Sequence, residues 1–143
     1  MLKSFTSCHS LLVVFYGLLS LLSGCAVGTN IAYEGKRLPD ENIAIIKTNA
    51  SSSWTNVSVK FVDGKDMGGC GPSCDVEMLH GMHQIGINWL YNYTLYVGII
   101  EFHAEAGSEY VLRASMVKGQ PLVWLENKTT NKVVGRTIAR KFK

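Results

Sequence analysis

The residue types that could carry chemistry gather in one segment, "DMGGCGPSCDVEMLHGMH", residues 66–83. Two cysteines, Cys70 and Cys74, bracket a Gly-Pro-Ser turn, and His80 and His83 follow them. A turn with glycine and proline can bring two α-carbons to the roughly 4.4–6.8 Å that a disulfide requires. In an oxidising compartment the sequence therefore predicts a Cys70–Cys74 disulfide that stiffens a small loop.

The same segment leaves two other kinds of chemistry open. Thiolates and imidazoles are ligands for zinc or copper(I), so the two cysteines together with His80 and His83 could form a metal site. The spacing of the two histidines is shorter than that of the usual zinc-binding pair. Cys-Gly-Pro-Ser-Cys also resembles the thioredoxin active site with one residue inserted, but no βαβ pattern surrounds it. A metal- or thiol-dependent function is thus the alternative to a structural disulfide.

A second candidate site is an aromatic stripe in "WLYNYTLY". Trp89, Tyr91 and Tyr93 have a spacing of two, which on a strand places three rings on one face. Such rings can stack on sugars, so the stripe suggests glycan binding, with peptidoglycan or lipopolysaccharide as the ligand. The stripe also continues Ile85 and Ile87, and this continuity favours packing in the core.

Motifs of catalysis do not occur in the sequence. It contains no nucleophile elbow, no phosphate-binding loop and no pair of carboxylates in a recognisable motif. We therefore expect a protein without catalytic residues, and without a cofactor apart from covalent lipid.

The N-terminal residues have the pattern of an export signal. Lys3 precedes an apolar stretch, residues 11–22, that is too short to span a bilayer. The following "LSGC", residues 22–25, resembles the bacterial lipobox, which implies a lipid on the Cys25 thiol, removal of the signal peptide and acylation, for example by palmitate, of the new amino terminus. The next residue, Ala26, is not the aspartate that commonly retains lipoproteins in the inner membrane. We expect a lipid-anchored protein of the outer membrane that faces the periplasm.

The chain therefore divides into three parts. Residues 1–24 are the expected signal peptide, residues 25–42 the lipidated cysteine and a tether, and residues 43–143 a single domain. The net charge falls from +3 to +2 when Lys3 is removed, which argues against a nucleic-acid partner. Basic residues crowd the end of the chain, where they could meet anionic head groups but are more often simply solvated: Arg136, Arg140, Lys141 and Lys143.

The domain has the periodicity of strands. In residues 56–64, Val57, Val59 and Phe61 alternate with polar residues, and Asp63-Gly64 predicts a tight turn. Residues 83–90 alternate in the same way.

The second half of the domain continues this pattern. The apolar runs within residues 94–117 are interrupted at 106–108, which predicts a long antiparallel hairpin. Residues 121–139 predict a last pair that turns through 128–131. Since no stretch has a sustained helical period with caps, we expect an all-β fold, a single antiparallel β-sandwich of about seven to eight strands.

Five short motifs extend over most of this domain: "YEGKRLPDENIAII", "VKFVDGK", "EMLHGMHQIGI", "FHAEAGSEYVLRA" and "WLENKTTNKVVG". In this order they resemble small proteobacterial envelope lipoproteins of uncharacterised function. The chain departs from that pattern at His80, where the group tends to have proline, and in the insertion from Cys70 to Cys74. The resemblance implies no activity. We therefore expect a non-catalytic interaction or accessory module of the envelope, whose partner is an envelope protein or a glycan.

Overall fold

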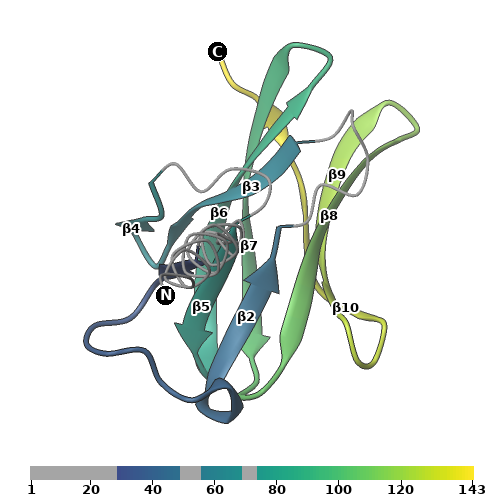
Figure 1. Ribbon diagram of the computed structural model, residues 1–143. Helices are drawn as coiled ribbons and strands as arrows, with labels where there is room; N and C mark the ends of the chain where they lie inside the picture. The colour runs from purple at the N-terminus through teal and green to yellow at the C-terminus, as the bar shows by residue number, and fades with distance from the viewer. Residues whose placement is uncertain (1–28, 49–55, 69–73) are drawn as a thin grey trace, which may run out of the picture.

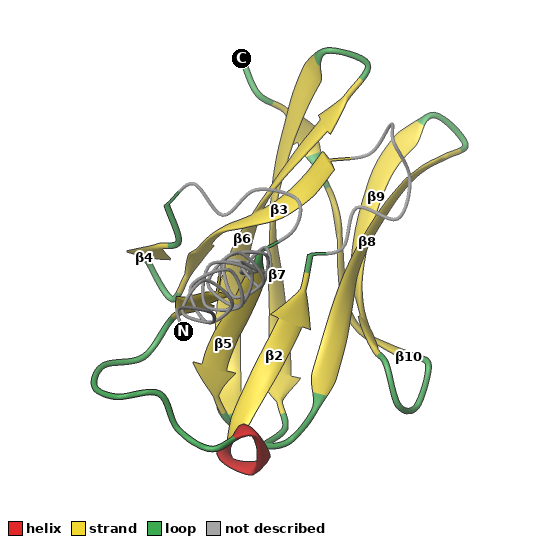
Figure 2. Cartoon of the chain, viewed as in Figure 1, coloured by secondary structure: helices red, strands yellow, loops and turns green. Residues whose placement is uncertain are grey.

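A computed structural model describes residues 29–48, 56–68 and 74–143. Within them eleven strands form two sheets, and the one helix is a short 3₁₀ turn, Asp40–Asn42 (Figures 1 and 2). The prediction of a nearly all-β, sandwich-like domain is confirmed. The predicted count of seven to eight strands is too low, because three further strands of two or three residues extend the sheets.

The first sheet has six strands in the order β1-β5-β2-β8-β9-β10. Two of its pairs, β1 with β5 and β2 with β8, are parallel, so the expectation of a strictly antiparallel fold is wrong. Strand β1 lies within residues 25–42, which were expected to be a tether, and it belongs to this sheet. The strands are β1 (Thr29–Ile31), β2 (Ile43–Lys47), β5 (Asp75–Leu79), β8 (Glu109–Val117), β9 (Gln120–Asn127) and β10 (Lys132–Ile138).

The second sheet has five strands in the order β11-β7-β6-β3-β4, and all of its pairs are antiparallel. The predicted turn at Asp63-Gly64 joins β3 to β4, and both residues have the positive φ that such a turn needs, 48° and 83°. The strands are β3 (Asn56–Val62), β4 (Lys65–Asp66), β6 (Gly81–Tyr91), β7 (Thr94–Ala104) and β11 (Arg140–Lys141).

The hairpin predicted for residues 94–117 does not form. β7 pairs with β6 and β11, whereas β8 pairs with β2 and β9 in the other sheet. The connection between β7 and β8 crosses between the sheets, and the N–H of Gly107 donates to the carbonyl of Ile43, at 2.8 Å. Alternation along a strand specifies which side chains are buried but not which strand is the neighbour. The predicted pair β9–β10 is confirmed.

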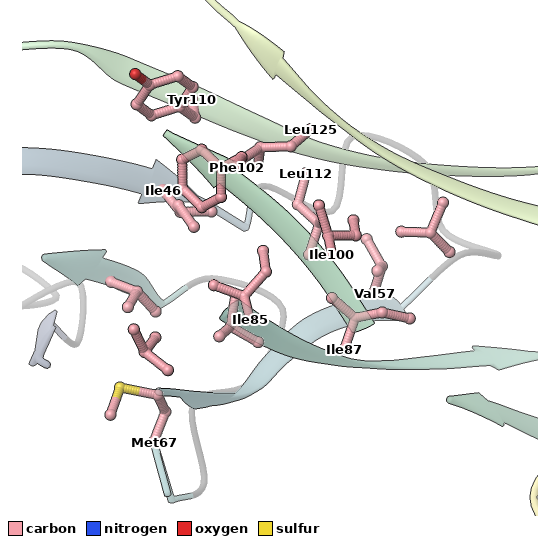
Figure 3. Packing of buried hydrophobic residues seen from close by; sticks show 14 of the residues in the cluster. Ile46, Val57, Met67, Ile85, Ile87, Ile100, Phe102, Tyr110, Leu112 and Leu125 are labelled. Carbon is pink, nitrogen blue, oxygen red and sulfur yellow. The ribbon is translucent and has the colours of Figure 1, made fainter. Parts of the chain in front are cut away.

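The core lies between the two sheets and contains buried side chains from both (Figure 3). The rings of Phe102 on β7 and Tyr110 on β8 meet edge to face, with centroids 5.3 Å apart, and so join the sheets directly. The Tyr110 hydroxyl also accepts a hydrogen bond from the N–H of Glu105, at 2.9 Å. Every described strand and core residue follows residue 28, so a chain of residues 26–143 contains all of these contacts.

The end of the chain passes from one sheet to the other. β10 belongs to the six-stranded sheet and β11 to the five-stranded sheet, and the buried Ala139 lies between them (Figure 1). Gly98 on β7 permits this close passage, because a Cβ there would lie only 2.8 Å from Cγ2 of Thr137. The N–H of Phe142 then donates to the carbonyl of Leu95, at 2.8 Å. This crossing segment, residues 137–142, therefore runs along β7.

Candidate functional site

A groove of about 710 Å³ lies on the outer face of the five-stranded sheet. It is open to solvent and is lined by residues of β3, β6, β7 and the crossing segment. Its volume lies within the range of roughly 300–1,000 Å³ that is typical of ligand sites. The apolar side chains that form it include Phe61, Leu95, Val97, Ile99, Ile138 and Phe142.

Strand β7 supplies the apolar floor because it is hydrophobic on both faces. Ile100 is buried in the core, whereas the side chain of its neighbour Ile99 lies in the groove and is 49% exposed. Leu95 and Val97 share the outer face with Ile99, since successive side chains of a strand alternate. An exposed apolar surface of this kind marks an interaction or ligand site more often than a solvated face.

One wall of the groove is the ring of Phe61. A β-bulge at Lys60 places Phe61 opposite Gly86, and a Cβ on Gly86 would lie only 2.0 Å from Cε1 of the ring. The ring therefore occupies the space above Gly86. The sequence placed Phe61 on the same face as Val57 and Val59, and this was wrong because the bulge adds one residue to the alternation.

The opposite wall comes from the crossing segment. Ile138 and Phe142 are 55% and 62% exposed, and both line the groove. Arg140 lies between them, opposite Val97 in the strand pairing. The predicted basic tail is therefore partly ordered: Arg140 and Lys141 form an edge strand.

The charge of the groove is positive. Lys60, Asn88, Thr137 and Arg140 are the polar residues of its lining, and none of the described lining residues is acidic. The Lys60 ammonium donates to both carboxylate oxygens of Asp66, at 3.0 and 2.8 Å. Arg140 forms no ion pair with any residue that the structure describes. The groove thus combines apolar walls with a cation that the described protein does not neutralise.

The histidines predicted as metal ligands have different environments. His80 is exposed, whereas the side chain of His83 is 13% exposed and bonded at both ring nitrogens. Its Nδ1 lies 2.6 Å from Oδ2 of Asp63, and its Nε2 lies 2.8 Å from the carbonyl oxygen of Leu79. A metal ion on His83 would have to displace one of these partners.

The cysteines of the same segment are only partly described. Cys74 is buried at 7% exposure, while Cys70 lies outside the described residues. Within the ranges given above, no three histidine, cysteine or acidic side chains gather closely enough to hold a metal ion. The Cys70–Cys74 disulfide and a zinc or copper site at these residues both stay predictions.

The contact between Asp63 and His83 fixes the β3–β4 turn against β6. Burial alone would raise the pKa of Asp63, but a hydrogen bond from the N–H of Gln84 and the hydrogen bond and charge of His83 outweigh it. The net result is a pKa for Asp63 below its usual value. The pair lies outside the lining of the groove.

The three rings of the predicted glycan stripe do not form one exposed surface. Trp89 is fully buried, and its ring centroid lies 5.3 Å from that of Tyr91 and 5.5 Å from that of Tyr96. Tyr93 is fully exposed in the turn after β6, where its φ is +58°. Trp89 therefore cannot stack on a sugar. Glycan binding stays a prediction, and of the three rings only those of Tyr91 and Tyr93 could contribute to it.

Sequence reasoning missed the groove, although one signal pointed to it. The run "LYVGII", residues 95–100, is apolar at consecutive positions, which indicates a strand with two covered or ligand-binding faces. Phe61 and the crossing segment gave no such signal. The predicted lipidation site, Cys25, lies outside the described residues. No helix in the described ranges is long and apolar enough to cross a membrane.

Comparison with known proteins identifies no relative: no family model, no curated protein and no solved structure matches the chain. The resemblance to small envelope lipoproteins thus rests on the sequence motifs alone, and the function has to be argued from the groove.

Proposed function

We propose that this chain is a lipid-anchored, non-catalytic binding module of the bacterial outer membrane, with a periplasm-facing β-sandwich domain that binds an apolar ligand in its groove. The observation that carries the proposal is the exposed apolar surface around Val97 and Ile99, with walls on both sides. Concave, mostly apolar sites with a few polar groups are typical of ligand binding.

The lipid anchor is supported by the sequence. The apolar stretch at residues 11–22 and the lipobox-like "LSGC" that ends at Cys25 have the order expected of a lipoprotein precursor. Acyl chains contribute about 0.8 kcal/mol per buried methylene, so several chains on Cys25 would hold the domain at a membrane.

The polar groups of the groove are suited to binding. Its described polar side chains are those of a lysine, an arginine, an asparagine and a threonine. These groups can orient a ligand by charge and hydrogen bonding. The one carboxylate–imidazole pair described above, Asp63 with His83, lies outside the lining and has both ring nitrogens occupied.

The anchor is tested by the mass of the protein purified from membranes. We expect the mass of residues 25–143 with added diacylglycerol and acyl groups. A Cys25→Ala variant should lose this modification and keep residues 1–24. An unmodified wild-type chain would contradict the lipid anchor. It would not bear on the groove, which is tested independently by dye binding.

The groove is tested with Nile Red, a neutral dye that fluoresces in apolar sites. We expect the dye to bind to residues 26–143, and Val97→Trp to abolish binding by filling the groove. Val133→Trp is the matched control, because Val133 is 54% exposed on β10 and outside the groove. If neither variant changes binding, or if both do so equally, the groove is not the binding surface.

A further inference from the structure

We propose that the ligand of the groove is an anionic membrane phospholipid, with an acyl chain along the apolar walls and the phosphate at Arg140. This inference rests on the proposed function, because it assumes that the groove is a binding surface. It goes further by naming the chemical class of the ligand. The apolar lining, the position of Arg140 and the absence of acidic groups from the described lining carry it.

The apolar surface has the form of a strip that a chain can follow. Leu95, Val97 and Ile99 lie at alternate positions of β7, and a strand rises about 3.3 Å per residue, so together they extend over about 13 Å. The crossing segment runs beside them, with Phe142 next to Leu95. A flexible alkyl chain fits an elongated strip of this kind, whereas a compact polar metabolite would leave it in contact with water.

The position of Arg140 explains why the ligand should be anionic. Arg140 pairs with Val97 in the strand register and is part of the groove lining, so its cation is available to a ligand that lies on the strip. A guanidinium can donate two parallel hydrogen bonds to a phosphate, and it is weakly hydrated compared with an ammonium. Lys60, the other cation of the lining, is already bonded to Asp66. Arg140 is therefore the residue that discriminates an anionic head group from a neutral one.

A second copy of the chain fits the groove less well. In a two-fold symmetric contact the same surface of each copy forms the interface, so the cations of both grooves would be enclosed in one contact area. No acidic residue of the described lining could neutralise them. An anionic amphiphile instead covers the apolar strip and compensates the charge in one molecule.

The test compares two probes that have the same acyl chain. Myristoyl lysophosphatidylglycerol is anionic, and myristoyl lysophosphatidylcholine is zwitterionic. Titration calorimetry and native mass spectrometry of residues 26–143, below the micelle concentration, should show one bound lysophosphatidylglycerol per chain and weaker binding of the choline lipid. Glycerol phosphate, the head group without the chain, should not bind measurably.

Two variants test whether Arg140 is responsible for the preference for the anionic lipid. Arg140→Gln should weaken lysophosphatidylglycerol binding by about tenfold, as expected for the loss of one charge-assisted contact, and should weaken binding of the choline lipid by a smaller factor, because the choline cation already compensates the phosphate that Arg140 would contact. Lys132→Gln removes a charge from an exposed position of β10 outside the groove and should change neither affinity. An unchanged circular dichroism spectrum and melting temperature of Arg140→Gln show that the variant is folded.

The outcomes separate this inference from the proposed function. Equal affinity for the two lipids, no effect of Arg140→Gln, or glycerol phosphate binding as tight as that of the lysolipid would each overturn the inference. A chain that binds Nile Red but neither lysolipid would also overturn it, while the groove would still be a binding site. A folded chain that does not bind Nile Red would overturn both.

Discussion

The Nδ1 atom of His83 lies 2.6 Å from the carboxylate oxygen Oδ2 of Asp63, across the β3–β4 turn. The other oxygen of Asp63 accepts a hydrogen bond from the N–H of Gln84, at 2.8 Å. The second ring nitrogen of His83 lies 2.8 Å from the carbonyl oxygen of Leu79. One carboxylate and one imidazole therefore tie the turn to β6 and to the end of β5.

This relationship predicts an acid-sensitive contribution to stability. The pKa of Asp63 is lower in the folded chain than its ordinary value of 3.8, so the ionised group stabilises the fold above that pH. The contribution is lost as the pH falls through the folded pKa. We expect Asp63→Asn to lower the melting temperature by about 3 to 6 °C at pH 7. The difference should shrink in acid, as measured by circular dichroism across pH.

Asparagine is the suitable replacement because it tolerates the φ of +48° at position 63. Glu105→Gln is the control, since Glu105 is an exposed acid outside this network. Melting curves of the wild type and Asp63→Asn that stay equally separated throughout the acidic range would contradict the assignment.

The packing of β10 against β7 predicts that Gly135 tolerates no side chain. A Cβ there would lie 2.5 Å from Cγ2 of the buried Ile100 and 3.1 Å from the backbone oxygen of Glu101. We expect Gly135→Ala to lower the free energy of unfolding by about 1–3 kcal/mol, as overpacking does, measured by urea denaturation.

Gly86→Ala is the matched comparison. The atoms that its Cβ would meet belong to the far end of the Phe61 side chain, which can swing away into solvent. We expect a smaller loss of stability and weaker Nile Red binding, because the displaced ring changes the groove wall. An equal cost for both substitutions would mean that the Phe61 ring is fixed as firmly as the core.

The ion pair between Arg37 and Glu77 predicts an asymmetric response to mutation. Glu77 is buried at 2% exposure, and its Oε1 accepts a hydrogen bond from Nε of Arg37, at 2.7 Å, while its Oε2 is buried and has no hydrogen-bond partner among the described residues. Arg37→Gln leaves a buried carboxylate without its cation, whereas Glu77→Gln leaves an arginine that water can reach. Thermal melting at pH 7 should show the larger loss for Arg37→Gln. The reverse order would contradict this account.

The environment of the Trp89 indole predicts that replacing it with phenylalanine lowers the free energy of unfolding only slightly. The ring is fully buried, but its Nε1 donor has no hydrogen-bond partner in the part of the chain that the structure describes. We expect Trp89→Phe to cost about 1 kcal/mol or less, because removing an unsatisfied donor offsets part of the lost packing. Trp89→Ala should cost about 3–5 kcal/mol. Urea denaturation measures the loss of unfolding free energy for each substitution. If Trp89→Phe cost as much as Trp89→Ala, the Nε1 group would contribute to stability after all.

Local sequence predicted the elements of the fold well. The Asp63-Gly64 turn, the β9–β10 pair and the inward positions of Ile85, Ile87 and Ile100 follow from turn chemistry and from the period of two. These features depend on residues close together in the chain. The same information could not give the pairing of β7 and β8 with different sheets, because alternation fixes a face and leaves the neighbouring strand open.

The candidate site depended on information that no local pattern holds. Phe61 reaches the groove because a bulge reverses its direction, and Arg140 reaches it because Gly98 lets the crossing segment pass close to β7. The sequence by itself determined a β-rich chain and predicted an export signal and a lipidation site, because strand periodicity and lipobox-like spacing are properties of neighbouring residues. Only the tertiary structure decided where the apolar groove lies, because its walls come from β3, β7 and the end of the chain, which meet through long-range strand pairing.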